Sequence, residues 1–329
     1  MNPPSLIDPF GRRITYLRLS VTDRCDLRCL YCMDEDVRFV PRRELLSLEE
    51  LEAVGRAFVR LGVERIRITG GEPLVRRGVV HLAGRLAALP GLRELTLTTN
   101  GTQLARHARA LRAAGVARLN ISLDSLRPER FRRLSRVGRL EAVLAGIEAA
   151  RRAGFRRIKI NTVVLRGYNE DEVTDLLEFA LARGLDISYI EEMPLGRMAG
   201  RDRAGSYCSS GEVLKTLRAR HSLRPAAERS GGPSRYYRVP GHPSRIGFIS
   251  PHSRNFCGDC NRVRLTARGR LLLCLGREHS VDLREVLRTR GPGALPGAIR
   301  AAMALKPAGH EFQADGTVAV PRFMHVTGG

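Results

Sequence analysis

The chain has 329 residues, of which 43% are hydrophobic, enough to bury one large core or a large core and a smaller one. Its formal net charge of +22 comes almost entirely from arginine, because lysine occurs only at Lys159, Lys215 and Lys306. Such a charge favours a polyanionic partner, either nucleic acid or a small anion such as a nucleoside triphosphate. Aromatic residues make up only 5% of the chain, too few for the stacking platforms of a single-strand binder. We therefore expect a small anion and no nucleic-acid partner.

The cysteines point to a reducing compartment. Six of the seven fall in two spaced groups, which indicates metal ligation rather than a disulfide framework. Cys208 is left over and is expected to be a small buried or loop residue. No charged start with an apolar segment behind it and no uncharged stretch of membrane-spanning length occurs. We expect a cytoplasmic protein without membrane association.

Short apolar runs alternate with amphipathic stretches from Ile14 to about Pro194, the pattern of βα units and a parallel sheet. The predicted strands are Ile14–Thr22, Arg65–Thr69, Leu95–Thr99, Arg118–Leu123, Arg157–Leu165 and Asp186–Glu191. The predicted helices are Ser47–Leu61, Val79–Ala88, Gln103–Ala114, Arg139–Ala153 and Glu170–Ala182, with glycine caps at Gly62, Gly115, Gly154 and Gly184.

Six βα units without a dinucleotide fingerprint after the first strand favour an incomplete, six-stranded β/α barrel of the TIM type over a doubly wound sheet. A helix is predicted over Ser210–Arg220. The Pro-, Gly- and Ser-rich stretch Arg224–Arg235 then predicts an exposed connection into a separate C-terminal layer. We place a domain boundary near Arg220, with residues 1–220 forming the partial barrel and residues 221–329 a smaller domain that carries a second cluster.

The strongest chemical motif is C-x3-C-x2-C, formed by Cys25, Cys29 and Cys32 directly after the first predicted strand. Three close thiolates hold a metal or an iron–sulfur cluster, and a missing fourth protein ligand leaves one position open for another molecule. The alternatives are a zinc site completed by a distant histidine and three unrelated core cysteines.

This motif, with Tyr31 before its last cysteine, resembles the defining motif of the radical S-adenosylmethionine superfamily. The resemblance implies a 4Fe-4S cluster on the three cysteines, with S-adenosylmethionine chelating the fourth iron. One electron from the cluster would then cleave the sulfonium and release a 5′-deoxyadenosyl radical. By the same resemblance Tyr31, Gly71, Glu72, Ser122 and Met193 are cofactor-binding residues. The Gly70-Gly71-Glu72-Pro73 turn would hold the methionine end, with the Glu72 carboxylate receiving its ammonium group.

A second group has the spacing C-x2-C-x13-C and consists of Cys257, Cys260 and Cys274. A zinc ribbon would require a second C-x2-C pair, although His252 or His279 would also complete a zinc site. Beside the first motif, a second open 4Fe-4S site is the better interpretation.

Together, the two groups and the terminal Gly328-Gly329 resemble the GTP 3′,8-cyclase family of molybdenum-cofactor biosynthesis. The resemblance runs nearly end to end, through Leu17–Cys25, Arg67–Pro73, Leu97–Gly101 and Phe256–Cys260. It implies that GTP lies among Arg18, Arg67, Thr98, Lys159, Arg262, Val263 and Arg264, with guanine on the open iron of the second cluster. Arginine forks suit phosphate oxygens, and Arg18 and Arg67 stand inside apolar strands where an unpaired charge is costly.

The resemblance assigns catalytic roles to Arg18, Gly328 and Gly329, the tail reaching into the barrel. Three positions depart from the family pattern: Ser188 replaces an arginine, Asp34 a proline and Thr327 an isoleucine. The implied reaction removes hydrogen from C3′ of GTP and joins C3′ to C8. The product would pass to cyclic pyranopterin monophosphate synthase.

Two rival interpretations stay open at this point. One is another radical S-adenosylmethionine enzyme with an auxiliary cluster, such as a peptide maturase, which usually has more C-terminal cysteines. The other is a non-catalytic zinc protein that binds nucleic acid through its arginines. The sequence identifies neither the electron donor nor the oligomeric state, for which a homodimer is one option.

Overall fold

The computed structural model describes residues 5–198, 201–228 and 231–328. Strands and helices alternate along the first two thirds of the chain, as predicted. The first six strands each lie within two residues of the predicted ones. They are β1 (Tyr16–Ser20), β2 (Arg65–Thr69), β3 (Glu94–Thr99), β4 (Arg118–Ser122), β5 (Arg157–Val164) and β6 (Asp186–Glu191).

Between these strands run α1 (Leu48–Arg60), α2 (Val79–Ala87), α3 (Leu104–Ala113), α4 (Pro128–Ser135), α5 (Leu140–Arg152) and α6 (Val173–Ala182). Helix α1 starts with a capping box, in which Ser47 and Glu50 each accept the other's backbone N–H. The predicted glycine caps after α1, α3, α5 and α6 all have positive φ, from 64° to 91°. Helix α4 was not predicted, and the helix expected from Glu170 begins with a 3-10 turn, η3 (Glu170–Glu172).

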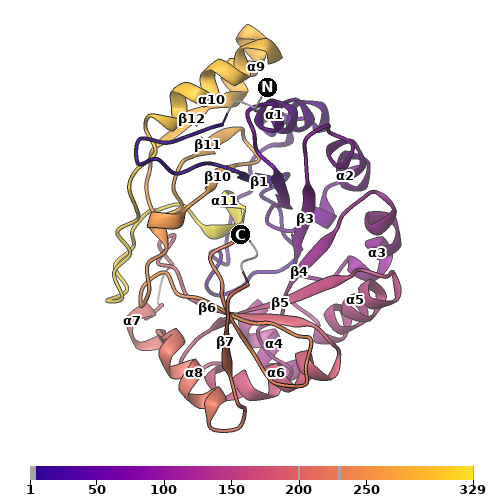
Figure 1. Ribbon diagram of the computed structural model, residues 1–329, viewed down its shortest axis with the longest axis vertical. Helices are drawn as coiled ribbons and strands as arrows, with labels where there is room; N and C mark the ends of the chain where they lie inside the picture. Colours follow the sequence, from indigo (N-terminus) through magenta and orange to yellow (C-terminus); the bar gives the residue numbers. More distant parts are fainter. Residues whose placement is uncertain (1–4, 199–200, 229–230, 329) are drawn as a thin grey trace.

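Strands β1 to β6 pair in chain order, and every pair is parallel. Strand β10 (Arg262–Leu265) joins this sheet parallel to β1, and β9 (Ile246–Ile249) joins it parallel to β6. The antiparallel strands β11 (Arg270–Leu272) and β12 (Ser280–Asp282) extend one edge, and β8 (Arg235–Arg238) and β7 (Arg224–Ala226) extend the other. Figure 1 shows this sheet curving around the C-terminus, with helices outside. The chain therefore has the α/β fold of an incomplete barrel.

The C-terminal part contributes short elements. They are α7 (Arg203–Ser206), α8 (Ser210–Arg218), α9 (Leu283–Arg290), α10 (Leu295–Met303) and α11 (Met324–Thr327), with 3-10 turns η1 (Arg42–Glu44), η2 (Pro73–Val75), η4 (Cys257–Asp259) and η5 (Pro292–Ala294). The start of the stretch Arg224–Arg235 is largely exposed, as predicted, but the stretch does not lead to a separate layer, because β7 and the first residue of β8 belong to the same sheet. Strands of three and four residues are too short to show a period in sequence. The sheet continues across the boundary placed near Arg220, which stays a prediction.

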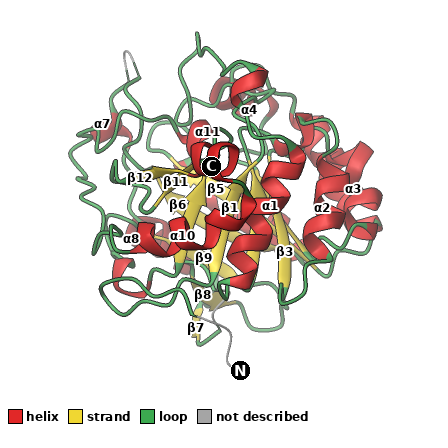
Figure 2. Ribbon diagram, turned by 90° about the horizontal axis from the view of Figure 1, so that it is seen from above, coloured by secondary structure: helices red, strands yellow, loops and turns green. Residues whose placement is uncertain are grey.

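Strand β5 shows how the curved sheet separates two environments. Ile158, Ile160 and Val164 are buried among the apolar residues that pack under the helices, whereas Lys159 and Asn161 line a cavity. The side chains alternate because successive residues of a strand point to opposite faces. In the view from above, α11 lies at the same end of the strands as α4 and α7 (Figure 2). Within the described ranges, no helix has both the length and the hydrophobicity required to span a bilayer.

Candidate active site

A cavity of about 290 Å³ lies inside the curved sheet. With the exception of Glu72, Gly328 and Gly329, every residue predicted to bind a metal, cofactor or substrate lines it. Gly329 lies outside the described residues. The cysteines of the first group follow the carboxyl end of β1, whereas Cys260 lies two residues before β10, in which Arg262 pairs with Tyr16 at the start of β1. The two groups are therefore separated by about the length of β1, or roughly 16 Å for five residues.

The first cysteine group lies on a loop fastened to the end of α4. The backbone N–H of Arg28 donates to Ser135 O at 3.0 Å, and that of Leu30 donates to Leu134 O at 3.0 Å. Burial raises the pKa of the Cys25 thiol to about 12 and raises the pKa of Cys29 and Cys32 as well. Thiols in this setting stay protonated until a metal replaces the proton. Three such sulfurs on one cavity wall fit a cluster with an open iron.

Tyr31 is held by Asp124, a residue that sequence reasoning missed. The Tyr31 hydroxyl donates to Asp124 Oδ2 at 2.6 Å, and Asp124 Oδ1 accepts the backbone N–H of Val163 at 2.9 Å. Burial raises the pKa of Asp124 to about 6. The pair connects the first cysteine loop to the ends of β4 and β5.

Gly71 and Glu72 have different roles in the turn after β2: Gly71 allows a close backbone contact, and Glu72 accepts hydrogen bonds. A Cβ on Gly71 would lie 2.5 Å from Arg24 O, so only glycine allows this close passage beside the first cysteine loop. The Glu72 carboxylate is fully buried and accepts hydrogen bonds from Leu74 N at 2.9 Å, Thr99 Oγ1 at 2.8 Å and Asn100 N at 2.6 Å. Three donors, from η2, from the end of β3 and from the residue after it, thus occupy most of its roughly four acceptor positions, and the expectation that it receives the ammonium group of a cofactor stays a prediction. Burial raises its pKa to about 8.

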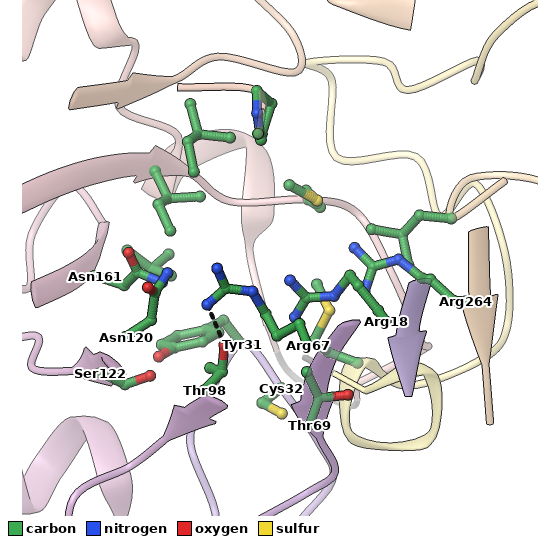
Figure 3. Close-up of a pocket in the computed structure, with 18 of the residues that line it drawn as sticks. Arg18, Tyr31, Cys32, Arg67, Thr69, Thr98, Asn120, Ser122, Asn161 and Arg264 are labelled. Atoms are coloured by element: carbon green, nitrogen blue, oxygen red, sulfur yellow. Dashed lines mark hydrogen bonds between the residues drawn. The ribbon is translucent and has the colours of Figure 1, made fainter. Parts of the chain in front are cut away.

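Three arginines form a row along the cavity wall (Figure 3). Arg18 pairs in register with Arg67 on β2 and with Arg264 on β10. Arg67 donates to Thr98 Oγ1 at 3.2 Å and also to the hydroxyl of Tyr16. Burial, then the neighbouring guanidinium groups, lowers the pKa of Arg18 well below its ordinary value and that of Arg264 to about 10. Arg67 is buried and Arg18 and Arg264 are half-buried, and adjacent cations that are largely removed from water favour an anion in the space they face.

Lys159 extends the cationic wall to the other side of the cavity. Its ammonium group lies 3.5 Å from Ser234 Oγ, and Ser234 Oγ lies 3.3 Å from Ser188 Oγ. Burial lowers the pKa of Lys159. Ser188, which replaces the arginine of the family pattern, therefore contributes a hydroxyl beside Lys159 rather than a charge. Arg118 on β4 also lines the cavity and was not predicted.

The C-terminal tail enters from the side of β1. Gly328 O accepts hydrogen bonds from Arg18 Nη2 at 2.9 Å and from Arg264 Nη1 at 3.2 Å. Gly328 is buried, has φ +77°, and would place a Cβ 2.4 Å from Thr69 Oγ1. The tail therefore reaches the arginine row, and a larger residue does not fit there.

The second cysteine group spans η4 and the residues after β11. Burial would raise the pKa of Cys260, but the charges of Arg262 and Lys306 outweigh burial and lower it. Cys257 Sγ accepts the backbone N–H of His310 at 3.5 Å. No three His, Cys, Asp or Glu side chains in the described part of the chain are grouped as ligands of a single ion. His252, considered as a zinc ligand, has Nε2 at 2.8 Å from Glu192 O.

Several further cavity residues were missed by sequence reasoning, namely Asn100, Asn120, Asn161, His310 and Phe312. For two of them the sequence did contain an indication that they line the site. Asn120 stands two residues before Ser122, and Asn161 stands two residues after Lys159, so each shares a strand face with a predicted residue.

Two sequence-family models divide the chain. The Radical SAM superfamily model matches residues 19–180, and the model described as Molybdenum Cofactor Synthesis C matches residues 185–312. GTP 3′,8-cyclase of Pseudomonas entomophila is 61% identical over 332 residues, covering 100% of this chain and 99% of the relative. GTP 3′,8-cyclase 1 of Pseudomonas aeruginosa is 63% identical over 327 residues, covering 98% of this chain and 99% of the relative.

Solved structures agree on the fold. Streptococcus suis SuiB has a TM-score of 0.60 at 16% identity, covering 89% of this chain and 69% of SuiB. SuiB bound to S-adenosylmethionine has a TM-score of 0.57 with the same identity and coverage. These likenesses establish the fold, and the identity over the whole chain establishes the family. The chain is a radical S-adenosylmethionine enzyme with two 4Fe-4S cluster sites, and it belongs to the GTP 3′,8-cyclase family.

Proposed function

We propose that this chain converts GTP to 3′,8-cyclo-7,8-dihydro-GTP in molybdenum-cofactor biosynthesis. The observation that carries the proposal is a cavity with a cysteine group at each end and buried or half-buried cations between them. A nucleoside triphosphate provides the negative charge that these cations favour. When bound, the first cluster and S-adenosylmethionine supply one-electron chemistry that removes a hydrogen atom from carbon.

The cationic residues bind and orient the substrate. Arg67 on β2 and Lys159 on β5 line different sides of the cavity and bind phosphate oxygens, the first as a fork and the second as a point charge. Thr98 holds Arg67 in place through the 3.2 Å hydrogen bond. Arg262, Val263 and Arg264 lie on β10, next to the second cysteine group, and contact the nucleoside part.

Arg18 and the tail complete the wall around the reacting sugar. Arg18 contacts the substrate and, through Gly328 O, fixes the tail. Gly328 approaches the ligand with backbone alone and excludes water from the reacting carbon, and the family resemblance assigns the same role to Gly329. Tyr31, Gly71, Ser122 and Met193 surround S-adenosylmethionine on the side of the first cysteine group.

The remaining assignments concern partners. The product passes to cyclic pyranopterin monophosphate synthase, and the electron comes from a donor of unidentified nature. Cysteines that must stay reduced to bind iron favour the cytoplasm. A homodimer is the oligomeric state to test first.

The test uses GTP carrying deuterium at C3′. Reconstituted enzyme with S-adenosylmethionine and a chemical reductant should transfer deuterium to 5′-deoxyadenosine, measured by mass spectrometry, and should form the cyclised nucleotide. ATP, which has the same triphosphate and a different base, serves as the matched control and should give neither. Absence of deuterium transfer from GTP, with S-adenosylmethionine still cleaved, would contradict the proposal.

A further inference from the structure

Lys306 is buried beside the second cysteine group. Its side chain follows α10 and is 3% exposed. It is one of three lysines in a chain with 56 lysine and arginine residues together. A lysine in the interior of an arginine-rich protein calls for a specific explanation, since a buried ammonium group is stable only when it is well paired.

The ammonium group has three N–H donors, and three acceptors surround it. Lys306 Nζ lies 2.6 Å from Leu273 O, 3.1 Å from Arg262 O and 3.8 Å from Cys260 Sγ. A compact ammonium group directs its three donors to separate acceptors, whereas a guanidinium group presents its donors in one plane. The site therefore suits lysine better than arginine.

These acceptors belong to the segments that carry the second group of cysteines. Cys260 is itself a cluster ligand, Leu273 directly precedes the ligand Cys274, and Arg262 follows Cys260 by two residues. Lys306 thus joins two of the three ligand segments with one positive charge. The third segment is held separately, because Arg12 Nη1 donates to Cys257 O at 2.7 Å.

A hydrogen bond to a cluster sulfur and a nearby positive charge both stabilise the reduced, more negative state of an iron–sulfur cluster. Burial strengthens the effect, because charges interact more strongly in a medium of low dielectric constant. Arg12 and Arg262 are the other cations around this group. Among the hydrogen bonds of the described residues, Lys306 donates to a cysteine sulfur, whereas the guanidinium groups of Arg12 and Arg262 do not.

We propose that Lys306 sets the reduction potential of the second cluster, raising it through the contact with Cys260 Sγ and through its buried charge. The step concerned is the uptake of one electron by the oxidised cluster, without proton transfer. The inference depends on the second cluster being bound and is independent of the reaction of GTP.

The experiment measures the potential of each cluster separately. In a Cys25, Cys29, Cys32→Ala background only the second cluster is loaded, and a dithionite titration with redox mediators follows its electron paramagnetic resonance signal. Lys306→Met should lower the equilibrium constant for reduction about tenfold, a shift of about 59 mV to more negative potential for one electron. Lys306→Arg, which keeps the charge, should recover part of this shift.

Two controls separate this role from a structural one. Lys215→Met removes an exposed lysine on α8 and should leave the potential unchanged. In the reciprocal Cys257, Cys260, Cys274→Ala background, Lys306→Met should not change the potential of the first cluster. An unchanged second-cluster potential in Lys306→Met would overturn the proposal. If Lys306→Met binds no second cluster, Lys306→Gln and Lys306→Arg are compared instead, and equal potentials for these two would overturn it.

Discussion

Replacing Gly328 by alanine tests whether the C-terminal tail acts inside the cavity. Gly328 has φ +77° and ψ +56°, a left-handed conformation that raises the energy of an L-residue by roughly 1–2 kcal/mol. The new Cβ would also lie 2.4 Å from Thr69 Oγ1, far inside van der Waals contact. Either effect pushes the tail away from the arginine row.

The size of the effect follows from the contacts that the tail makes. Displacement removes the Gly328 carbonyl from Arg18 and Arg264, and loss of a buried acceptor costs about 1–3 kcal/mol. The lower ends of the two ranges add to about 2 kcal/mol, which shifts the ratio of seated to unseated tail roughly thirtyfold. We expect Gly328→Ala to reduce conversion of GTP by at least about tenfold, because 1.36 kcal/mol corresponds to a factor of ten.

The assay measures cyclised nucleotide and 5′-deoxyadenosine together, so that loss of product is separated from loss of cofactor cleavage. Iron content and cleavage of S-adenosylmethionine should be close to those of the parent. Gly154→Ala is the matched control, because Gly154 ends a helix with φ +77°, is exposed and has nothing within 4 Å of its Cβ position. It carries similar backbone strain far from the cavity and should leave product formation intact. Parental product formation by Gly328→Ala would refute the role of the tail.

Three further predictions concern the cavity. Changing Cys25, Cys29 and Cys32 together to alanine should reduce the iron content from about eight to about four per chain and abolish cleavage of S-adenosylmethionine, since each cubane cluster contains four irons; eight irons retained, or stoichiometric zinc, would contradict the ligand assignment. Arg264→Ala should weaken GTP turnover without loss of iron, and parental turnover would return Arg264 to a structural role. Ultraviolet difference titration should show a tyrosine ionising near pH 8, because Arg67 and Arg18 lower the pKa of Tyr16 to about 8 in spite of burial. Tyr16→Phe should remove this step, and a titration without it in the parent would contradict the assignment. Since the folded pKa lies below the ordinary value of 10, the contribution of Tyr16 to stability is complete above pH 10 and is lost as the pH falls through about 8.

The sequence predicted the parallel strands and the residues at their ends because both depend on local patterns. Alternating apolar residues identify a strand, and motifs after parallel strands meet at one edge of the sheet. This rule added weight to the family resemblance, which had assigned Gly71, Ser122 and Met193 to one site. The short antiparallel strands β7, β8, β11 and β12 have three or four residues each and offer no such pattern.

The function of Glu72 could not be predicted in the same way. A sequence gives the chemistry of a side chain, but it does not show which neighbours already occupy its atoms. Leu74, Thr99 and Asn100 donate to the Glu72 carboxylate in the folded chain, two of them from a different strand and its loop. Lys306 was missed for a related reason, because its acceptors lie more than thirty residues away along the chain.

The pairing of β1 with β10 affects how the protein folds during synthesis. Thr15 and Asn261, at the start of this pair, are 246 residues apart. At 5–20 residues per second, the ribosome needs about 12–50 s to make the intervening chain. Throughout that time β1 has β2 on one side and an unpaired edge on the other, although it later lies inside the sheet. An exposed parallel edge is a hazard for association with other chains, so newly made protein should depend on chaperones until β10 emerges. Arg18 on β1, which lines the cavity of the folded protein, also disfavours edge-to-edge pairing in this interval.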